Sequence, residues 1–280
     1  MKHQRLIERV SIGIFFLTFV FFFWKTIYGM VMDWYLDDNY SHGFLIPVIS
    51  GYLLWQRRED IQAVNVRPSA LGLPLFVAGL TLFLFGHVAG EAFTMRLSML
   101  VVAASAILFC GGAPLFGTVA FPFFYLVFMI PLPYILYDAV AFPLKLFVSR
   151  YSVEFLALVG IPVYREGNVI NLVNTTLEVA DACSGIRSIV SLLALATALA
   201  YFTQKGWVKQ VILVVLSLPI AIFANGIRVI GTGILATYYG AKAAEGFFHE
   251  FAGLVIFGVA MALLMLSSFI LGKIGGSGHE

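Results

Sequence analysis

Long apolar runs alternate with short polar segments along almost the whole chain. A helix needs roughly 20 apolar residues to cross the hydrocarbon core of a bilayer. By this criterion the pattern predicts about eight membrane-spanning helices, of which the second is short. The predicted spans cover residues 11–31, 43–56, 69–88, 97–112, 114–131, 184–203, 210–231 and 250–271.

The segment 132–183, between the fifth and sixth predicted spans, has a different pattern. Polar and apolar residues are mixed over 138–158, which favours helices that lie at the membrane interface rather than a span. Residues 163–172 are typical of a β-hairpin with a Gly167-Asn168 turn, and residues 177–180 can add a third strand. We therefore predict a small cap outside the cytoplasm that ends at the sixth span.

Composition supports a membrane protein and excludes several other classes. Hydrophobic residues make up 61% of the chain and charged residues only 11%, whereas a soluble domain carries about 25% charged residues. Soluble globules, disordered chains, coiled coils and nucleic-acid-binding modules need more charge. The expected fold is an all-α polytopic membrane protein, with one integral membrane domain over residues 1–274 and a flexible tail at 275–280.

The distribution of charges predicts an orientation. With the N-terminus inside, the inner segments hold nine basic residues against four acidic ones, and the outer segments hold seven basic residues against eleven acidic ones. Basic residues are enriched in cytoplasmic loops of membrane proteins. Both termini are therefore expected in the cytoplasm and the cap on the outer side.

Cys183 lies in the run Asp181-Ala-Cys183-Ser-Gly185, which enters the sixth span. The N-terminus of a helix favours an anion and so favours a nucleophilic thiolate. The alternative is a small packing residue at the start of a helix. Cys110 has apolar neighbours and is expected to be inert.

Arg228 is a permanent cation in the outer half of the seventh predicted span. Placing it in lipid costs at least about 2.5–3.5 kcal/mol, so it should face protein, water or a partner. Asn225, three residues earlier, lies on the same helix face and suggests a fixed polar cluster. The alternative is that Arg228 extends to the outer interface.

His249 lies at the outer end of the eighth predicted span, on the same side of the membrane as Cys183 and Arg228. A thiol, a base and a guanidinium are the groups that acyl transfer through a thioester requires. A lone interfacial histidine is the alternative interpretation.

Three weaker candidates lie on the same outer side. His42 can contact substrate or cap a helix, and Asp181 and Glu178 can orient Arg228 or His249, or simply end the cap. The sequence holds no metal-ligand spacing, phosphate-binding glycine loop or nucleophile elbow, so no metal and no cofactor are expected.

The candidate residues belong to a set of short motifs spread along the chain. These are Tyr40-Ser-His-Gly-Phe-Leu-Ile-Pro47, Phe128-Met-Ile-Pro-Leu-Pro133, Gly167-Asn168-Val-Ile, Ala182-Cys-Ser-Gly185, Asn225-Gly-Ile-Arg228-Val and His249. Together they resemble the exosortase/archaeosortase family of integral membrane cysteine transpeptidases. By this resemblance Cys183 would be the nucleophile, Arg228 would stabilise the oxyanion or the substrate carbonyl, and His249 would be the general acid/base.

The resemblance also implies substrates, partners and a location. The substrates would be secreted proteins with a C-terminal Pro-Glu-Pro motif (PEP-CTERM), a transmembrane helix and a basic tail, and the acceptor could be a lipid or an exopolysaccharide. The location would be the inner (cytoplasmic) membrane, with the active site facing the exterior.

Two other functions stay open: a transporter or channel for an anion lined by Asn225, Arg228 and His249, and a scaffold for polysaccharide export.

Overall fold

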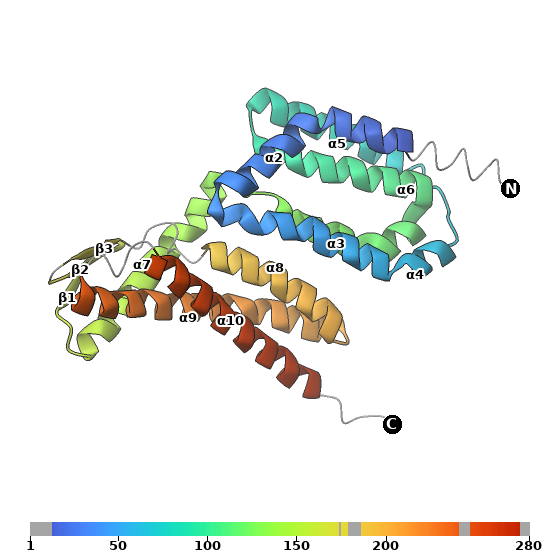
Figure 1. Ribbon diagram of the computed structural model, residues 1–280. Coiled ribbons are helices and arrows are strands. Elements are labelled where there is room, and N and C mark those ends of the chain that lie inside the picture. Colours follow the sequence, from blue (N-terminus) through green and yellow to red (C-terminus); the bar gives the residue numbers. More distant parts are fainter. Residues whose placement is uncertain (1–12, 174, 179–185, 241–246, 275–280) are drawn as a thin grey trace. The chain divides into compact units, whose positions relative to one another are not determined.

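The structure, a computed structural model, describes residues 13–173, 175–178, 186–240 and 247–274 (Figure 1). The chain divides into two compact units, residues 1–133 and 134–280, each described separately below. One integral membrane domain over residues 1–274 stays a prediction, and the tail at 275–280 lies outside the described residues.

Unit 1 begins with a bent pair of helices, Gly13–Phe22 and α2, which meet at an angle of 67°. The break falls within the predicted first span, and α2 continues five residues beyond its predicted end. The elements of unit 1 after the bend are α2 (Trp24–Leu36), η1 (Asp38–Phe44), α3 (Leu45–Gln56), α4 (Arg58–Ala63), α5 (Gly72–Ala89), α6 (Ala92–Tyr125) and η2 (Leu126–Met129).

A two-residue connection makes α5 and α6 antiparallel neighbours. Gly90 ends α5 in the left-handed region (φ 66°), and the Glu91 carboxylate accepts hydrogen bonds from the N–H groups of Phe93 and Thr94 at the start of α6. Burial raises the pKa of Glu91, but these hydrogen bonds outweigh burial and lower it below its usual 4.5. Because the hydrogen bonds favour the ionised form, Glu91 is a good cap at neutral pH.

The helix α6 reverses direction at Gly112, which has φ 73° and ψ −173°. A side chain there would collide with the carbonyl oxygen of Arg67. Beyond this residue the chain returns along α3, since Arg57 donates to the Thr118 carbonyl (2.9 Å) and Ser50 to the Pro122 carbonyl (2.7 Å). The prediction of two separate apolar segments, 97–112 and 114–131, therefore agrees with the position of the break.

Hydrogen bonds join η1 and α2 to the segment around η2. The indole N–H of Trp34 donates to the Met129 carbonyl (2.8 Å), and the Tyr40 hydroxyl donates to the Leu132 carbonyl (3.2 Å). Gly43 packs directly against the Trp34 ring, where there is no room for a Cβ. Two of the motif segments quoted above, 40–47 and 128–133, are thus held together within unit 1.

Unit 2 combines four helices with a small sheet in the order β1-β2-β3, all antiparallel. The predicted hairpin is confirmed: Glu166 pairs with Val169 across a turn in which Gly167 has φ 62°. The predicted third strand is also present, while 138–158 lies in one helix rather than several. The elements are α7 (Tyr134–Leu158), β1 (Val163–Glu166), β2 (Val169–Leu172), β3 (Thr176–Glu178), α8 (Ile186–Thr203), α9 (Trp207–Tyr239) and α10 (Phe247–Lys273).

The sheet and α7 share a hydrophobic core with the last part of α9. Ile170 of β2 is fully buried against Val148 of α7 and Val229 of α9, and Leu156 of α7 packs with Ala236 of α9. These contacts explain why α9 continues to Tyr239, eight residues beyond the predicted end of the seventh span. One face of its last turns is covered by protein, whereas Tyr238 and Tyr239 are exposed.

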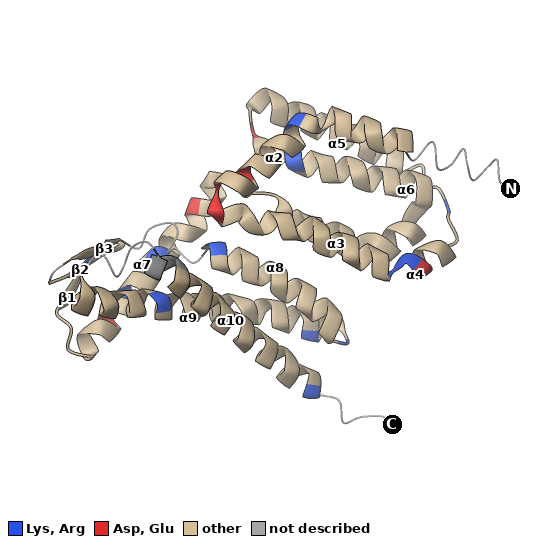
Figure 2. Ribbon diagram, viewed as in Figure 1, with Lys and Arg blue, Asp and Glu red and all other residues tan. Residues whose placement is uncertain are grey.

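Four helices of the described chain are long and apolar enough to cross a membrane, and the bent pair at the start would be a fifth. Helices coincide with all eight predicted ranges, but α3 has only 12 residues, about 18 Å, and α6 covers two predicted spans. Large apolar side chains are exposed along these helices, such as Phe21 and Val88, as is expected of surfaces that face lipid. Figure 2 shows that charged residues lie mostly towards helix ends and in connecting segments.

Candidate active site

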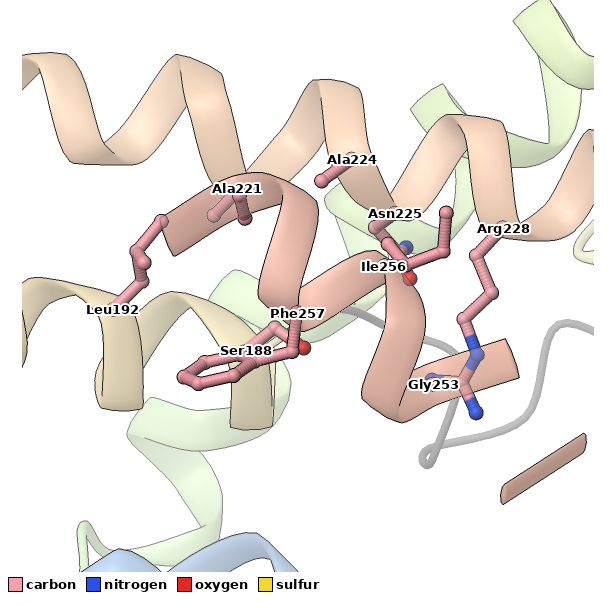
Figure 3. A pocket seen from close by; sticks show the side chains of 10 residues that line it. Ser188, Leu192, Ala221, Ala224, Asn225, Arg228, Gly253, Ile256 and Phe257 are labelled. Carbon is pink, nitrogen blue, oxygen red and sulfur yellow. The ribbon is translucent and has the colours of Figure 1, made fainter. Parts of the chain in front are cut away.

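A pocket lies among α8, α9 and α10 of unit 2 (Figure 3). The three helices share a buried core that includes Leu192, Leu213 and Leu264. The pocket is small, with a cavity volume of about 10 Å³, which is room for about one water molecule. Its lining residues are Ser188, Leu192, Ala221, Ala224, Asn225, Arg228, Gly253, Ile256, Phe257 and Ala260.

Asn225 and Arg228 both line this pocket, as their spacing on one helix face predicts. Asn225 is only 3% exposed, and Arg228 is half-buried with its Nε atom fully covered. Figure 3 shows both side chains on the side of α9 that faces α10. The guanidinium of Arg228 is therefore directed at protein, which disfavours simple extension to the interface.

The Arg228 guanidinium lies against the backbone of α10 at Gly253. A Cβ built on Gly253 would be 3.3 Å from Nη2 and 3.4 Å from Cζ of Arg228. Gly253 is the fourth residue after His249 and belongs to the same helix. The two helices that carry Arg228 and His249 are thus in contact at the cation.

The lining of the pocket changes from polar to apolar along the helices. Arg228 and Gly253 lie at one end. Ala221 is seven residues before Arg228 in α9, and Ala260 is seven residues after Gly253 in α10, about 10 Å at 1.5 Å per residue. A cation and polar groups beside an apolar slot can bind a carbonyl oxygen or an oxyanion strongly, because little water screens the interaction.

The other predicted site residues are only partly described. Cys183 and Asp181 lie outside the described residues, just before α8. His249 is in the first turn of α10 and Glu178 is the last residue of β3, but their side chains are likewise outside the described part. His42 lies in η1 of unit 1, with its Nδ1 atom buried. The convergence of Cys183, Arg228 and His249 therefore stays a prediction.

Of the ten residues that line the pocket, only Asn225 and Arg228 are among the site residues predicted from sequence. Ser188 and Gly253 are the unpredicted ones that lie near Cys183 and His249 along the chain. Ser188 is in the first turn of α8, five residues after Cys183. Helical spacing points to Gly253, because residues four apart share a face and Gly253 is four residues after His249. Gly253 has no side chain, so polar motifs do not reveal it.

Comparison with known proteins identifies the family. A family model described as "Transmembrane exosortase (Exosortase_EpsH)" matches residues 34–266. No curated protein and no solved structure was found to match the chain. The match covers most of the chain, including the segments that form the pocket. The chain therefore belongs to the transmembrane exosortase family and is a multi-pass membrane protein.

Proposed function

We propose that this protein is a membrane-embedded cysteine transpeptidase that cleaves a C-terminal PEP-CTERM-type sorting signal from secreted proteins. Cys183 is the nucleophile, Arg228 stabilises the oxyanion, and His249 is the general acid and base. The observation that carries the proposal is the position of Arg228 in a pocket among the three helices that follow or carry these residues, in a chain of the exosortase family.

Chain length supports a close approach of Cys183 to this pocket. Cys183 is five residues from Ser188, which lines the pocket, so its Cα lies at most about 18 Å from that of Ser188. On the other side of Cys183, Leu177 of β3 packs into the core that contains Val229, the neighbour of Arg228. Both ends of the segment that carries Cys183 are therefore anchored near Arg228.

Helix geometry similarly supports His249. It is four residues before Gly253 in α10, about 6 Å along the helix axis, and a Cβ at Gly253 would be 3.3 Å from Nη2 of Arg228. An imidazole on that face of α10 would lie one turn from the cation. This spacing suits two groups that act on neighbouring atoms of one peptide bond.

The first half of the reaction follows from these groups. The Cys183 thiolate attacks the carbonyl carbon of the scissile peptide bond, and Arg228 stabilises the negative charge that develops on its oxygen. The carbon–nitrogen bond then breaks while His249 donates a proton to the leaving amine. The products are a thioester on Cys183 and a free fragment that contains the helix and basic tail of the substrate.

The second half restores the enzyme. Neutral His249 takes a proton from an incoming amine, hydroxyl or water, which attacks the thioester carbon. Arg228 again stabilises the oxyanion, the carbon–sulfur bond breaks, and the Cys183 thiolate and the His249 imidazolium are regenerated. A lipid or an exopolysaccharide is the proposed acceptor, and water gives hydrolysis.

We also propose eight spans in the inner membrane, with both termini in the cytoplasm and the pocket near the outer face. The reversal at Gly112 supports two spans within α6, because its 34 residues are about 50 Å long and a bilayer core is only about 30 Å thick. Within unit 1, Asp33, Asp37 and Glu91 lie at the proposed outer ends of helices, whereas Arg57 and Arg58 lie at an inner end. This separation agrees with the positive-inside rule.

The direct test is to replace Cys183 and follow the processing of a tagged substrate. In cells that produce both proteins, the Cys183→Ala variant should leave the substrate at full length, because no thioester can form. Cys110→Ala is the matched control, because Cys110 is the other cysteine of the chain. Its side chain is exposed, and it is far in sequence from the residues that line the pocket. It should process substrate at the normal rate.

Each outcome has a definite meaning. Normal processing by Cys183→Ala, with equal amounts of protein in the membrane, would exclude the thiol mechanism and leave the transporter and scaffold functions. Loss of processing in Cys183→Ala but not in Cys110→Ala supports the proposal. Recovery of a covalent adduct between Cys183 and the N-terminal part of the substrate would identify the thioester directly.

A further inference from the structure

Gly253 stands at the closest approach between α10 and the guanidinium of Arg228. Its missing Cβ leaves 3.3 Å to Nη2, 3.4 Å to Cζ and 3.8 Å to Nε of Arg228. Three atoms of the same guanidinium therefore lie within 4 Å of the Cβ position of Gly253. A Cβ at this position would be in tight contact with the planar head of the arginine, which would have to shift by a few tenths of an ångström.

The space at Gly253 differs from that at the other described glycines of α10. A Cβ at Gly258 or Gly272 would meet nothing within 4 Å. Glycine in the middle of a helix is unfavourable because it loses more conformational freedom on folding than alanine. At Gly253 the absence of a side chain leaves space for the guanidinium of Arg228, which lines the pocket.

We propose that Gly253 is a positioning residue for Arg228: its bare backbone sets where the guanidinium lies in the pocket and hence where the substrate carbonyl oxygen is held. This inference rests on the proposed function and adds to it a residue without a side chain that acts through Arg228. A few tenths of an ångström matter here, because catalytic groups lose efficiency steeply with displacement. A methyl group at Gly253 displaces the guanidinium by about that amount.

The test compares Gly253→Ala, Gly253→Val and Gly258→Ala for the rate at which tagged substrate is processed. We expect Gly253→Ala to slow processing by about 3-fold to 10-fold and Gly253→Val by about 100-fold, in line with the effect of displacing a catalytic group by about 1 Å. Gly258→Ala, the same change in the same helix, should process at the normal rate. All variants are compared at equal amounts of protein in the membrane.

A double variant distinguishes positioning of Arg228 from a general effect on packing. Lys at position 228 has a compact ammonium in place of the planar guanidinium, so the steric effect at Gly253 should disappear. Gly253→Ala should therefore slow the wild-type enzyme but not the slower Arg228→Lys enzyme. An equal factor in both backgrounds would overturn the inference, because independent effects multiply.

A further variant tests the inference if the Gly253→Ala protein accumulates poorly in the membrane. The double variant with Arg228→Ala removes the guanidinium and with it the collision, so it should accumulate normally. Continued loss of the double variant, or normal processing by Gly253→Ala, would overturn the inference. Neither result touches the proposed function, whose own test is Cys183→Ala measured in the same cells.

Discussion

Arg228 is a candidate site residue because its charge lies inside an apolar helix. It is a cation within a helix that is long and apolar enough to cross a membrane, and its side chain is half-buried beside α10. Such a charge is expensive in lipid, which is why its position in the sequence points to a site. Asn225, one turn away and almost fully buried, completes the polar end of the pocket.

The charge of Arg228 can be tested through its neighbour. In the Asn225→Asp variant a carboxylate three residues from Arg228 would pair with the guanidinium and offset its charge. We expect substrate processing to fall at least about tenfold below that of Asn225→Ala, which corresponds to about 1.4 kcal/mol at the transition state. Equal processing by the Asp and Ala variants would contradict a role for the positive charge of Arg228.

For single residues, the sequence predicts polar and charged members of the site better than residues that matter through packing. Arg228 and Asn225 could be predicted because polar residues are rare in an apolar span and their spacing places them on one face. Gly253 could not, because its contribution is a missing side chain that matters only once α9 and α10 are packed together. The roles of Cys183 and His249 stay predictions from motif and position.

Among the elements, the α5 and α6 pair depends on small residues. Gly72, Gly79 and Gly86 recur every seven residues and are all buried. Side chains at these positions would meet α6 at Phe109, Val102 and Met95, at distances of 2.6 to 2.9 Å. Close approach of helix backbones at small residues is a main source of helix association in membranes.

We predict that Gly72→Ala destabilises unit 1 by about 1–3 kcal/mol, the usual cost of inserting a methyl group into a packed interface. The added Cβ would lie 2.6 Å from the backbone nitrogen of Phe109, which cannot move as a side chain can. Gly51→Ala in α3 is the control, because nothing lies within 4 Å of its Cβ position. Unfolding in detergent measures both; equal stability of the two variants would argue against the close packing.

Element boundaries could be predicted only where the chain has a strong local signal. The β-hairpin followed from the Gly167-Asn168 turn, and the break in α6 lies beside Gly112, where the two predicted spans meet. The predicted seventh span ends eight residues before the end of α9. The sequence does not distinguish apolar turns that lipid covers from apolar turns that a cap covers. In the structure α7 and the sheet cover one face of the last turns of α9.

For the whole molecule, the proposed topology makes the two sides of the membrane chemically distinguishable. We predict that single cysteines introduced as Glu59→Cys and Ala113→Cys react with a membrane-impermeant maleimide only after cells are opened. Tyr164→Cys, in the exposed strand β1, should react in intact cells. The background carries Cys110→Ala and Cys183→Ala, so that only the introduced thiol is labelled.

Labelling of Ala113→Cys in intact cells would contradict an inner turn at Gly112 and hence the division of α6 into two spans. Composition and the positive-inside rule suffice to predict such a topology, because both depend on counts over long segments. They contain no information about which helices touch. The pocket among α8, α9 and α10 is therefore a result of the structure alone.

The continuity of α9 through Arg228 has a mechanical consequence. One uninterrupted helix, Trp207–Tyr239, forms a wall of the pocket and also the base on which the sheet is packed. Pro219 lies inside this helix before Arg228, and the part from Arg228 to Tyr239 contains no proline. A tilt of the sheet that carries this part of α9 with it would therefore also move Arg228, so that the cap and the cation are mechanically coupled.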